Sequence, residues 1–260
     1  MIVHGEFCQK NGDDPTEAWT NIRLGKITAS DLGRVVQLSG VLRNGEMPTS
    51  YMCEKLYERW TGRAKPGKWL SMAVNNGLLV EQKAALFAEM EYGLQIQHVG
   101  FVEDDAKRCG SSPDGLIGWD GILSDKPTEA FKLSGRETGM EIKCVALDTH
   151  IKWILESELP SDHLVQVQAS MYFSGCYEWH FLSYPLACYL DGFPPLHLVI
   201  ERDEKFCANL AESLDLFLQR YDEAFEILCE KNGGPPKRFV PSQPKPDPTL
   251  MDGIPFTPGN

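Results

Sequence analysis

The chain has 260 residues, a formal net charge of −12 and 42% hydrophobic residues. The hydrophobic content excludes a globally disordered chain, and the length fits one large domain or one domain with extensions. The acidic balance excludes a protein that coats nucleic acid with a uniformly basic surface, because phosphate binding needs local Lys and Arg. A basic channel on an acidic body stays compatible with these numbers.

Two further global features concern location and cysteine chemistry. No apolar run approaches the roughly 18 residues that a membrane-spanning helix needs. Residues 1–10 contain no apolar segment typical of a signal peptide. We therefore expect a cytoplasmic protein without a membrane segment. The eight cysteines form no CxxC pair, which favours reduced thiols over a zinc site or disulfides.

The first part of the chain is predicted to be largely helical, over residues 16–62. Residues 28–31 (Thr-Ala-Ser-Asp) offer N-cap chemistry for one helix, and Thr49 with Ser50 offers it for another. A third helix is predicted over residues 72–92. Its apolar side is expected to carry Leu78, Leu79, Ala85, Leu86 and Phe87.

The pattern then changes to alternation, which predicts a strand over residues 95–102. Further short strands are predicted at residues 116–119, 140–145, 179–184 and 196–201. Two helices are expected between and after them, over residues 162–173, capped by Ser161 or Asp162, and over 203–231, ended by the Asn-Gly-Gly at 232–234. The predicted fold is therefore α/β (α+β), with a central mixed sheet flanked by helices.

The end of the chain has a different composition. Eight of the 17 prolines lie between Pro235 and Pro258. Proline fixes φ and lacks an amide donor, so this segment is expected to be neither regular helix nor central strand. We predict one domain over residues 1–232 and a proline-rich tail or extended arm over 233–260.

The candidate chemistry centres on two short motifs, Ser-Pro-Asp-Gly at residues 112–115 and Glu-Ile-Lys at 141–143. Side chains two apart on a strand point to the same face, so Glu141 and Lys143 are expected to face one site. Asp114 precedes a neighbouring strand and can converge with Glu141. Each motif alone is common on solvated surfaces, but the combination between short apolar strands is more specific.

Two carboxylates of this kind offer the hard oxygen ligands that Mg²⁺ or Mn²⁺ prefers. A metal bound to Asp114 and Glu141 would lower the pKa of its water and neutralise charge on a scissile phosphate. Lys143 can orient or help deprotonate that water, or stabilise the charge that develops at phosphorus. The residues alone therefore indicate metal-dependent phosphodiester hydrolysis.

Two additional polar groups can support this site. Glu81 lies on the third predicted helix, and Gln166 lies near the start of the helix over residues 162–173. The alternative for Glu81 is an exposed residue paired with Lys83 or solvent. The alternative for Gln166 and Gln168 is polar helix surface.

In the order of these motifs, the sequence resembles the lambda-type phage exonucleases. These belong to the PD-(D/E)xK nuclease superfamily, which has a restriction-endonuclease-like core. The likeness runs from about Ala18 to Glu226. It is carried by Trp19 and by residues 23–30 (RLGKITAS), 77–81 (GLLVE), 112–115 (SPDG), 140–144 (MEIKC), 166–168 (QVQ) and 199–205 (VIERDEK).

The resemblance implies a role for each matching residue. It implies that Asp114 and Glu141 bind Mg²⁺, with Mn²⁺ as a substitute, that Lys143 acts on the attacking water, and that Glu81 and Gln166 support the catalytic site. It also implies that Arg23, Ser30 and Ser112 bind a 5′ phosphate. A guanidinium and two hydroxyls suit that anion, although an ion pair and a helix cap are the structural alternatives for Arg23 and Ser30.

The resemblance further implies an activity and partners. The activity is a 5′-to-3′ exonuclease that degrades one strand of duplex DNA to mononucleotides and leaves a 3′ single-stranded overhang for recombination. The implied partners are double-stranded DNA ends, two further copies of the chain in a homotrimeric ring, and a single-strand annealing protein. The implied location is the cytoplasm of a bacterial host.

Two departures from the family pattern stand out. A longer, mixed-charge segment is inserted near residues 120–138, where the family usually has a short turn. Residues 147–150 (Leu-Asp-Thr-His) stand where the family can carry an arginine near the phosphate. Two alternative functions stay open at this point, an end-independent DNA endonuclease of the same fold and a non-catalytic DNA-end-binding module.

Overall fold

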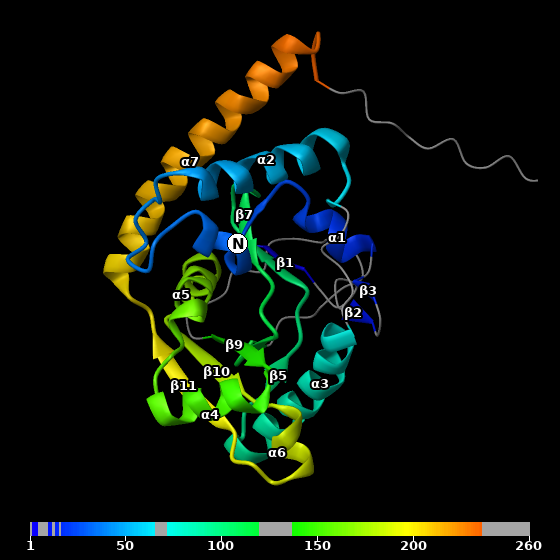
Figure 1. Ribbon diagram of the computed structural model, residues 1–260, viewed down its shortest axis with the longest axis vertical. Helices are drawn as coiled ribbons and strands as arrows, with labels where there is room; N and C mark the ends of the chain where they lie inside the picture. Colours follow the sequence, from blue (N-terminus) through cyan, green and yellow to red (C-terminus); the bar gives the residue numbers. More distant parts are fainter. Residues whose placement is uncertain are drawn as a thin grey trace, which may run out of the picture.

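The computed structural model of the protein describes residues 2–4, 10–11, 14–15, 17–65, 72–119 and 137–235. The segment 120–136 of the predicted insertion and the tail beyond residue 235 lie outside the described residues. Figure 1 shows two mixed sheets with helices packed around them. The predicted class, a mixed sheet flanked by helices, is therefore confirmed.

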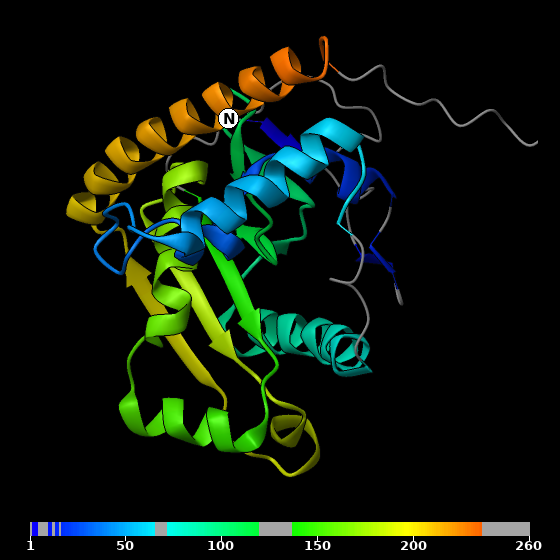
Figure 2. The same ribbon diagram turned by 45° about the horizontal axis from the view of Figure 1, so that its top comes forward.

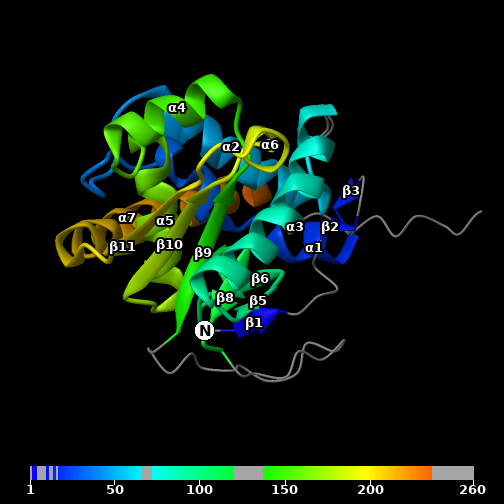
Figure 3. The ribbon, with the colours of Figure 1, turned by 90° about the horizontal axis from the view of Figure 1, so that it is seen from below.

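The larger sheet has five strands in the order β11-β10-β9-β8-β5. Its strands are β5 (Ile96–Gln97), β8 (Gly115–Ile117), β9 (Thr138–Lys143), β10 (Glu178–Ser183) and β11 (Leu196–Glu201). Only β9 and β10 run parallel, and the other neighbours are antiparallel. Figure 3 shows these strands following one another across the molecule.

The smaller sheet has four strands in the order β1-β6-β7-β4. Its strands are β1 (Ile2–His4), β4 (Ile27–Thr28), β6 (Phe101–Glu103) and β7 (Cys109–Ser111). A separate two-stranded ribbon pairs β2 (Lys10–Asn11) with β3 (Asp14–Pro15). The single strand predicted over 95–102 is wrong, because β5 and β6 belong to different sheets.

Seven α-helices and one 3-10 helix are described around the sheets. They are α1 (Glu17–Arg23), the 3-10 helix η2 (Ala29–Arg34), α2 (Glu46–Thr61), α3 (Met72–Tyr92), α4 (Leu147–Glu156), α5 (Ser161–Ser174), α6 (Leu186–Leu190) and α7 (Glu204–Lys231). The predicted bounds of α3 are confirmed. Helix α7 begins at an Asp203 cap that accepts from Lys205 N and Phe206 N, and Asn232 caps its end.

The predicted caps of the other helices are wrong. Thr28 stands at the N-cap of η2, but its side chain makes no capping hydrogen bond to the helix backbone. Helix α2 begins after Gly45, earlier than Thr49 and Ser50 implied, and α5 begins after Pro160, whose side chain has no acceptor. Thr49 and Ser50 therefore lie within the first turns of α2, and Ser161 and Asp162 are the first two residues of α5.

Three apolar clusters hold the layers together. Helix α5 covers one face of the large sheet, where Val167 and Met171 pack against Trp179 and Phe181. Helix α3 covers the opposite face through Ala84 and its neighbours. The third cluster joins η2, α5 and α7, and α2 runs beside α7 in Figures 1 and 2.

The apolar side predicted for α3 is correct only in part. Ala85 is buried and Phe87 packs against the cluster, but Leu86 is 58% exposed. The side chains of Leu78 and Leu79 lie outside the described residues. Small alanines form the buried face of the helix, which lets α3 approach the sheet closely.

One glycine fixes how β9 lies in the sheet. Gly139 faces Trp179 across the parallel β9–β10 pair, and a Cβ at this position would collide with the buried indole. The large side chain on β10 therefore requires glycine on β9. This pairing sets the register of the strand two residues before Glu141. Within the described part of the chain, no helix has the length and apolar character to cross a membrane.

Candidate active site

Asp114 is fixed where the chain enters β8. Its backbone N donates to Met140 O at 3.0 Å, and its Oδ2 accepts from Ile142 N at 2.6 Å. His98 Nδ1 lies 2.9 Å from Asp114 O. The carboxylate is thus held against β9, with Oδ1 left for other partners.

Glu141 and Lys143 lie on the same face of β9, as the alternation of a strand requires. Glu141 Oε1 accepts a hydrogen bond from the Lys143 ammonium and a second one, at 2.6 Å, from Gln166 Nε2 on α5. Glu141 is buried. The lysine and the glutamine therefore neutralise and orient a carboxylate that has little contact with solvent.

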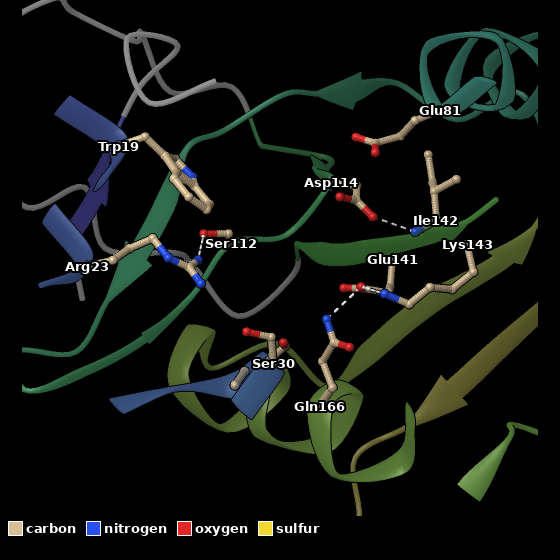
Figure 4. Close-up of a pocket in the computed structure, with 12 residues that line it drawn as sticks. Trp19, Arg23, Ser30, Glu81, Ser112, Asp114, Glu141, Ile142, Lys143 and Gln166 are labelled. Atoms are coloured by element: carbon tan, nitrogen blue, oxygen red, sulfur yellow. Dashed lines mark hydrogen bonds and ion pairs between the residues drawn. The ribbon is translucent and has the colours of Figure 1, made fainter. Parts of the chain in front are cut away.

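These groups open into a cavity of about 240 Å³. The cavity is lined by Trp19, Arg23, Ala29, Ser30, Glu81, Ser112, Asp114, Glu141, Ile142, Lys143, Gln166 and Ser170. All eight candidate residues from the sequence lie in this set. Figure 4 shows a carboxylate end, where Glu81 of α3 points toward Asp114 and Glu141, and an opposite end with Arg23 and Ser112.

The carboxylate end concentrates negative charge. Burial, and then the nearby Glu81 and Glu141, raise the pKa of Asp114 well above its ordinary value. Burial lowers the pKa of Lys143, but Glu141 and Asp114 outweigh it, so the pKa is raised. Lys143 is therefore an ammonium here, suited to orienting a water and stabilising negative charge.

The donor set of this end fits a hard divalent cation. Its side chains are carboxylates, and their mutual repulsion is the kind that a bound cation relieves. Among the residues that the structure describes, no three His, Cys, Asp or Glu side chains are placed to hold one ion. Asp114 and Glu141 thus fit an ion such as Mg²⁺, which usually keeps several waters and takes one or two protein carboxylates.

The opposite end is cationic and rich in hydroxyls. Arg23, at the end of α1, donates from Nη1 to Ser112 Oγ at 2.5 Å. Its guanidinium lies 4.2 Å from the Trp19 ring, and Trp19 Nε1 donates to Gly100 O at 3.2 Å. Burial lowers the pKa of Arg23 from its ordinary value, while Tyr51, Asp31 and Glu58 act in the opposite direction. Arginine nevertheless stays charged in proteins.

One residue and one segment that the sequence analysis singled out have structural roles away from the cavity. Gln168 donates from Nε2 to Glu201 O and accepts from Asp203 N, so it joins β11 to α7. The stretch 147–150 forms the first turn of α4, where His150 contacts Ser183 Oγ at 2.7 Å and Pro194 O at 2.9 Å. Neither segment lines the cavity.

Sequence reasoning missed two contributions to the cavity. Trp19 forms a platform beneath the guanidinium of Arg23, and the i, i+4 spacing of the two residues on α1 is the signal that indicates it. Ser170 follows Gln166 by about one helical turn, and a serine within a predicted helix carries no functional signal of its own.

Comparisons with known proteins place this geometry in context. The alkaline exonuclease LHK-Exo from Laribacter hongkongensis is 27% identical, with a TM-score of 0.67 over 84% of this chain and 98% of that chain. Its complex with dAMP gives 26% identity and a TM-score of 0.68 over the same shares. A phage-related exonuclease from Haemophilus somnus 129PT, at 14% identity and a TM-score of 0.57 over 78% of this chain and 96% of that chain, shows the fold alone.

The comparison at the level of sequence families is decisive. No curated protein matches the chain significantly. The model of the YqaJ-like viral recombinase domain matches residues 18–177, which is more than half of the chain. The resemblance to phage recombination exonucleases of the PD-(D/E)xK nuclease superfamily is thereby confirmed. The chain belongs to the family of YqaJ-like viral recombinase domains.

Proposed function

We propose that the protein is a Mg²⁺-dependent 5′-to-3′ exonuclease of duplex DNA, with Mn²⁺ as a substitute ion. It degrades one strand from the 5′ end to mononucleotides and leaves a 3′ single-stranded overhang for recombination in the bacterial cytoplasm. One observation carries this proposal: a single cavity joins a carboxylate cluster around the buried Glu141 to a half-buried arginine with two hydroxyls.

The carboxylate end supplies the hydrolytic chemistry. Asp114 and Glu141 would hold the ion, which provides a water of lowered pKa and a counter-charge for the scissile phosphate. Lys143, an ammonium beside Glu141, orients that water and stabilises the charge that develops on phosphorus. Gln166 keeps Glu141 in place through its 2.6 Å hydrogen bond. Glu81 faces the same space from α3 and supports the water shell.

The cationic end makes the activity dependent on DNA ends. A terminal 5′ phosphate carries more charge than an internal phosphodiester, and the Arg23 guanidinium with Ser30 and Ser112 matches its oxygens. The protein is acidic as a whole, so binding of a duplex is favoured where a free 5′ phosphate reaches this half-buried arginine. The name of LHK-Exo as an alkaline exonuclease and its crystallisation with dAMP support both the activity and a nucleoside monophosphate product.

The partners follow from the same proposal. We propose double-stranded DNA ends as substrate, a homotrimeric ring as the active assembly and a single-strand annealing protein as companion. The tail over residues 233–260 is a candidate contact for that companion or for a neighbouring subunit.

The proposal is tested by digestion of defined DNA in Mg²⁺ and in EDTA. A linear duplex labelled at the 5′ end should release labelled mononucleotide only with Mg²⁺, and a closed circle should stay intact. Cleavage of the circle would identify an endonuclease. Binding of linear ends without any cleavage in Mg²⁺ or Mn²⁺ would identify a non-catalytic end-binding module.

A further inference from the structure

One hydroxyl in the cavity belongs to neither of the two groups described above. Ser170 lies on α5, four residues after Gln166, and lines the cavity although it is only 2% exposed. Four residues are about one helical turn, so its side chain shares a face with Gln166 and lies about 6 Å further along the helix.

The hydrogen bonding of Ser170 differs from that of the next serine on the same face. A serine inside a helix commonly donates to a carbonyl one turn earlier. Ser174 does this, with its Oγ 2.7 Å from Ser170 O. Across the described ranges, no hydrogen bond involves Ser170 Oγ. Three side-chain atoms of those ranges are fully buried without a hydrogen-bond partner, namely His4 Nδ1, Ser111 Oγ and Trp179 Nε1. Ser170 Oγ is not one of them. The hydroxyl therefore faces the cavity with its donor free.

The packing of α5 places this donor toward the arginine end. Gln166 bonds to Glu141 at the carboxylate end. One turn later, Ala169 packs in the same core cluster as Ala29 of η2, the helix that carries Ser30. Ala29 and Ser170 both line the cavity. Ser170 thus lies further along α5 than the Gln166–Glu141 hydrogen bond, on the side of α5 that packs against η2, the helix of Ser30.

We propose that Ser170 donates a hydrogen bond to the terminal 5′ phosphate and is a fourth member of the anion site of Arg23, Ser30 and Ser112. This inference rests on the proposed function. A dianionic phosphate has three terminal oxygens, which accept more hydrogen bonds than one guanidinium and two hydroxyls supply. A hydrogen bond from a hydroxyl to an anion is also stronger than one between two neutral groups. This difference explains why a buried donor is kept free of protein partners.

The test compares 5′-dAMP with deoxyadenosine, which differ only by the phosphate, by calorimetric titration in EDTA. We expect Ser170→Ala to weaken dAMP binding about tenfold, the usual effect of losing one hydrogen bond to a charged group, and to leave deoxyadenosine binding unchanged. Ser170→Cys, which keeps the volume but is a poor donor, should show the same selective loss. Ser174→Ala is the matched control and should bind both ligands as the unmutated protein does.

The kinetic counterpart is the ratio of kcat/KM for 5′-phosphorylated and 5′-hydroxyl duplexes. Ser170→Ala should lower this ratio about tenfold. An unchanged ratio, or an equal loss of affinity for dAMP and deoxyadenosine, would overturn the role of Ser170. If the unmutated enzyme still prefers phosphorylated ends, the proposed function stands. An unmutated enzyme that binds dAMP no better than deoxyadenosine would overturn both.

Discussion

Asp114, Glu81 and Glu141 place three carboxylates around one small space, and their repulsion is the main electrostatic feature of the cavity. Burial and the two glutamates raise the pKa of Asp114, while Lys143 and Gln166 both donate hydrogen bonds to Glu141. The folded chain therefore carries an unfavourable interaction that a divalent cation would relieve. Under the proposed function, metal affinity and fold stability are coupled at this point.

Substitution of the two proposed ligands tests this coupling. Asp114→Asn and Glu141→Gln should abolish cleavage, because each removes a ligand charge at similar volume. In EDTA, Asp114→Asn should melt no lower than the unmutated protein, since repulsion is removed. Mg²⁺ should raise the Tm of the unmutated protein but not of either variant. A folded Asp114→Asn protein that digests linear DNA at the normal rate would show that the site assignment is wrong.

Substitution of Lys143 should reduce the cleavage rate less than substitution of either proposed ligand. Lys143→Ala should slow cleavage by about 10²- to 10⁴-fold, the usual contribution of a positioned proton-transfer or charge-stabilising group. Its single-turnover rate at saturating DNA separates this chemical defect from weaker DNA binding.

Arg23 leads to a prediction about DNA ends. Phosphorylated 5′ ends should be digested faster than hydroxyl ends, and Arg23→Ala should remove most of this preference. A charge-assisted contact is worth about 1.5–3 kcal/mol, or about 10- to 150-fold. Arg34 pairs with Glu54 and does not line the cavity, so Arg34→Ala should keep the preference. Equal rates on both ends in the unmutated enzyme would exclude this role of Arg23.

The residues that the sequence identified share one property: each stands inside a short ordered motif. Ser112 and Asp114 share one turn, and Glu141 and Lys143 share one strand face. Spacing alone therefore predicts that each pair acts together. Trp19 shares a helix face with Arg23 four residues later, a local signal. Ser170 reaches the cavity only through the packing of α5, and such a tertiary contact leaves no local pattern in the sequence.

At the scale of elements, periodicity succeeded where an element has one buried side and clear ends. Helix α7 has an Asp203 cap and an amphipathic pattern, and β11 was predicted with its bounds as described. The prediction failed over residues 95–102, because Gly100 donates to His4 O at 2.9 Å and turns the chain from one sheet into the other. Helix α4 was missed because it is short and begins after Ala146 without a side-chain cap, so it lacks a clear start signal.

The junction of β1, β6 and β4 depends on one buried carboxylate. Glu103 on β6 is paired with the ammonium of Lys26 and with His4 Nε2 at 3.0 Å. Its side chain is 2% exposed. Burial acts to raise the pKa of Glu103, but hydrogen bonds from His4 and Lys26 outweigh it, so the pKa is lowered.

Glu103→Gln should therefore destabilise the fold in a pH-dependent way. Because its folded pKa is lowered, ionised Glu103 contributes stability that is present above the unfolded value of about 4.3. This contribution is lost as the pH falls toward the folded pKa. At pH 8 we expect a loss of about 3 kcal/mol, typical of breaking a buried pair, and at pH 4 a smaller one. Urea unfolding measures both, with exposed Glu201→Gln as control; an equal difference at both pH values would contradict the prediction.

At the scale of the whole molecule, the charge of −12 must be reconciled with the proposed DNA substrate. The proposed closed ring would solve this problem, because basic residues need only line the channel while acidic faces point outward. Repetition of one heterologous contact closes such rings. The division into a domain over 1–232 and a tail over 233–260 stays a prediction, since the tail lies almost wholly outside the described residues.

The ring is tested by mass and by processivity. Light scattering at micromolar concentration should give about three times the 29.2 kDa of one chain, and a monomer mass would exclude the ring. With competitor DNA added after the start, a threaded ring should finish the strand that it has begun. An open enzyme should stop almost at once.

The tripeptide Ser112-Pro113-Asp114 also has a consequence for the size of the product. It carries the chain from β7 in one sheet to β8 in the other, and Cα atoms two residues apart are separated by at most about 7 Å. The proposed phosphate-binding site and the proposed hydrolytic site are thus joined by a short backbone connection, which proline stiffens. Under the proposed function, this backbone spacing would set the product at one nucleotide. A glycine inserted after Ser112 should lengthen this connection. Chromatography of the digest should then no longer show uniform mononucleotides.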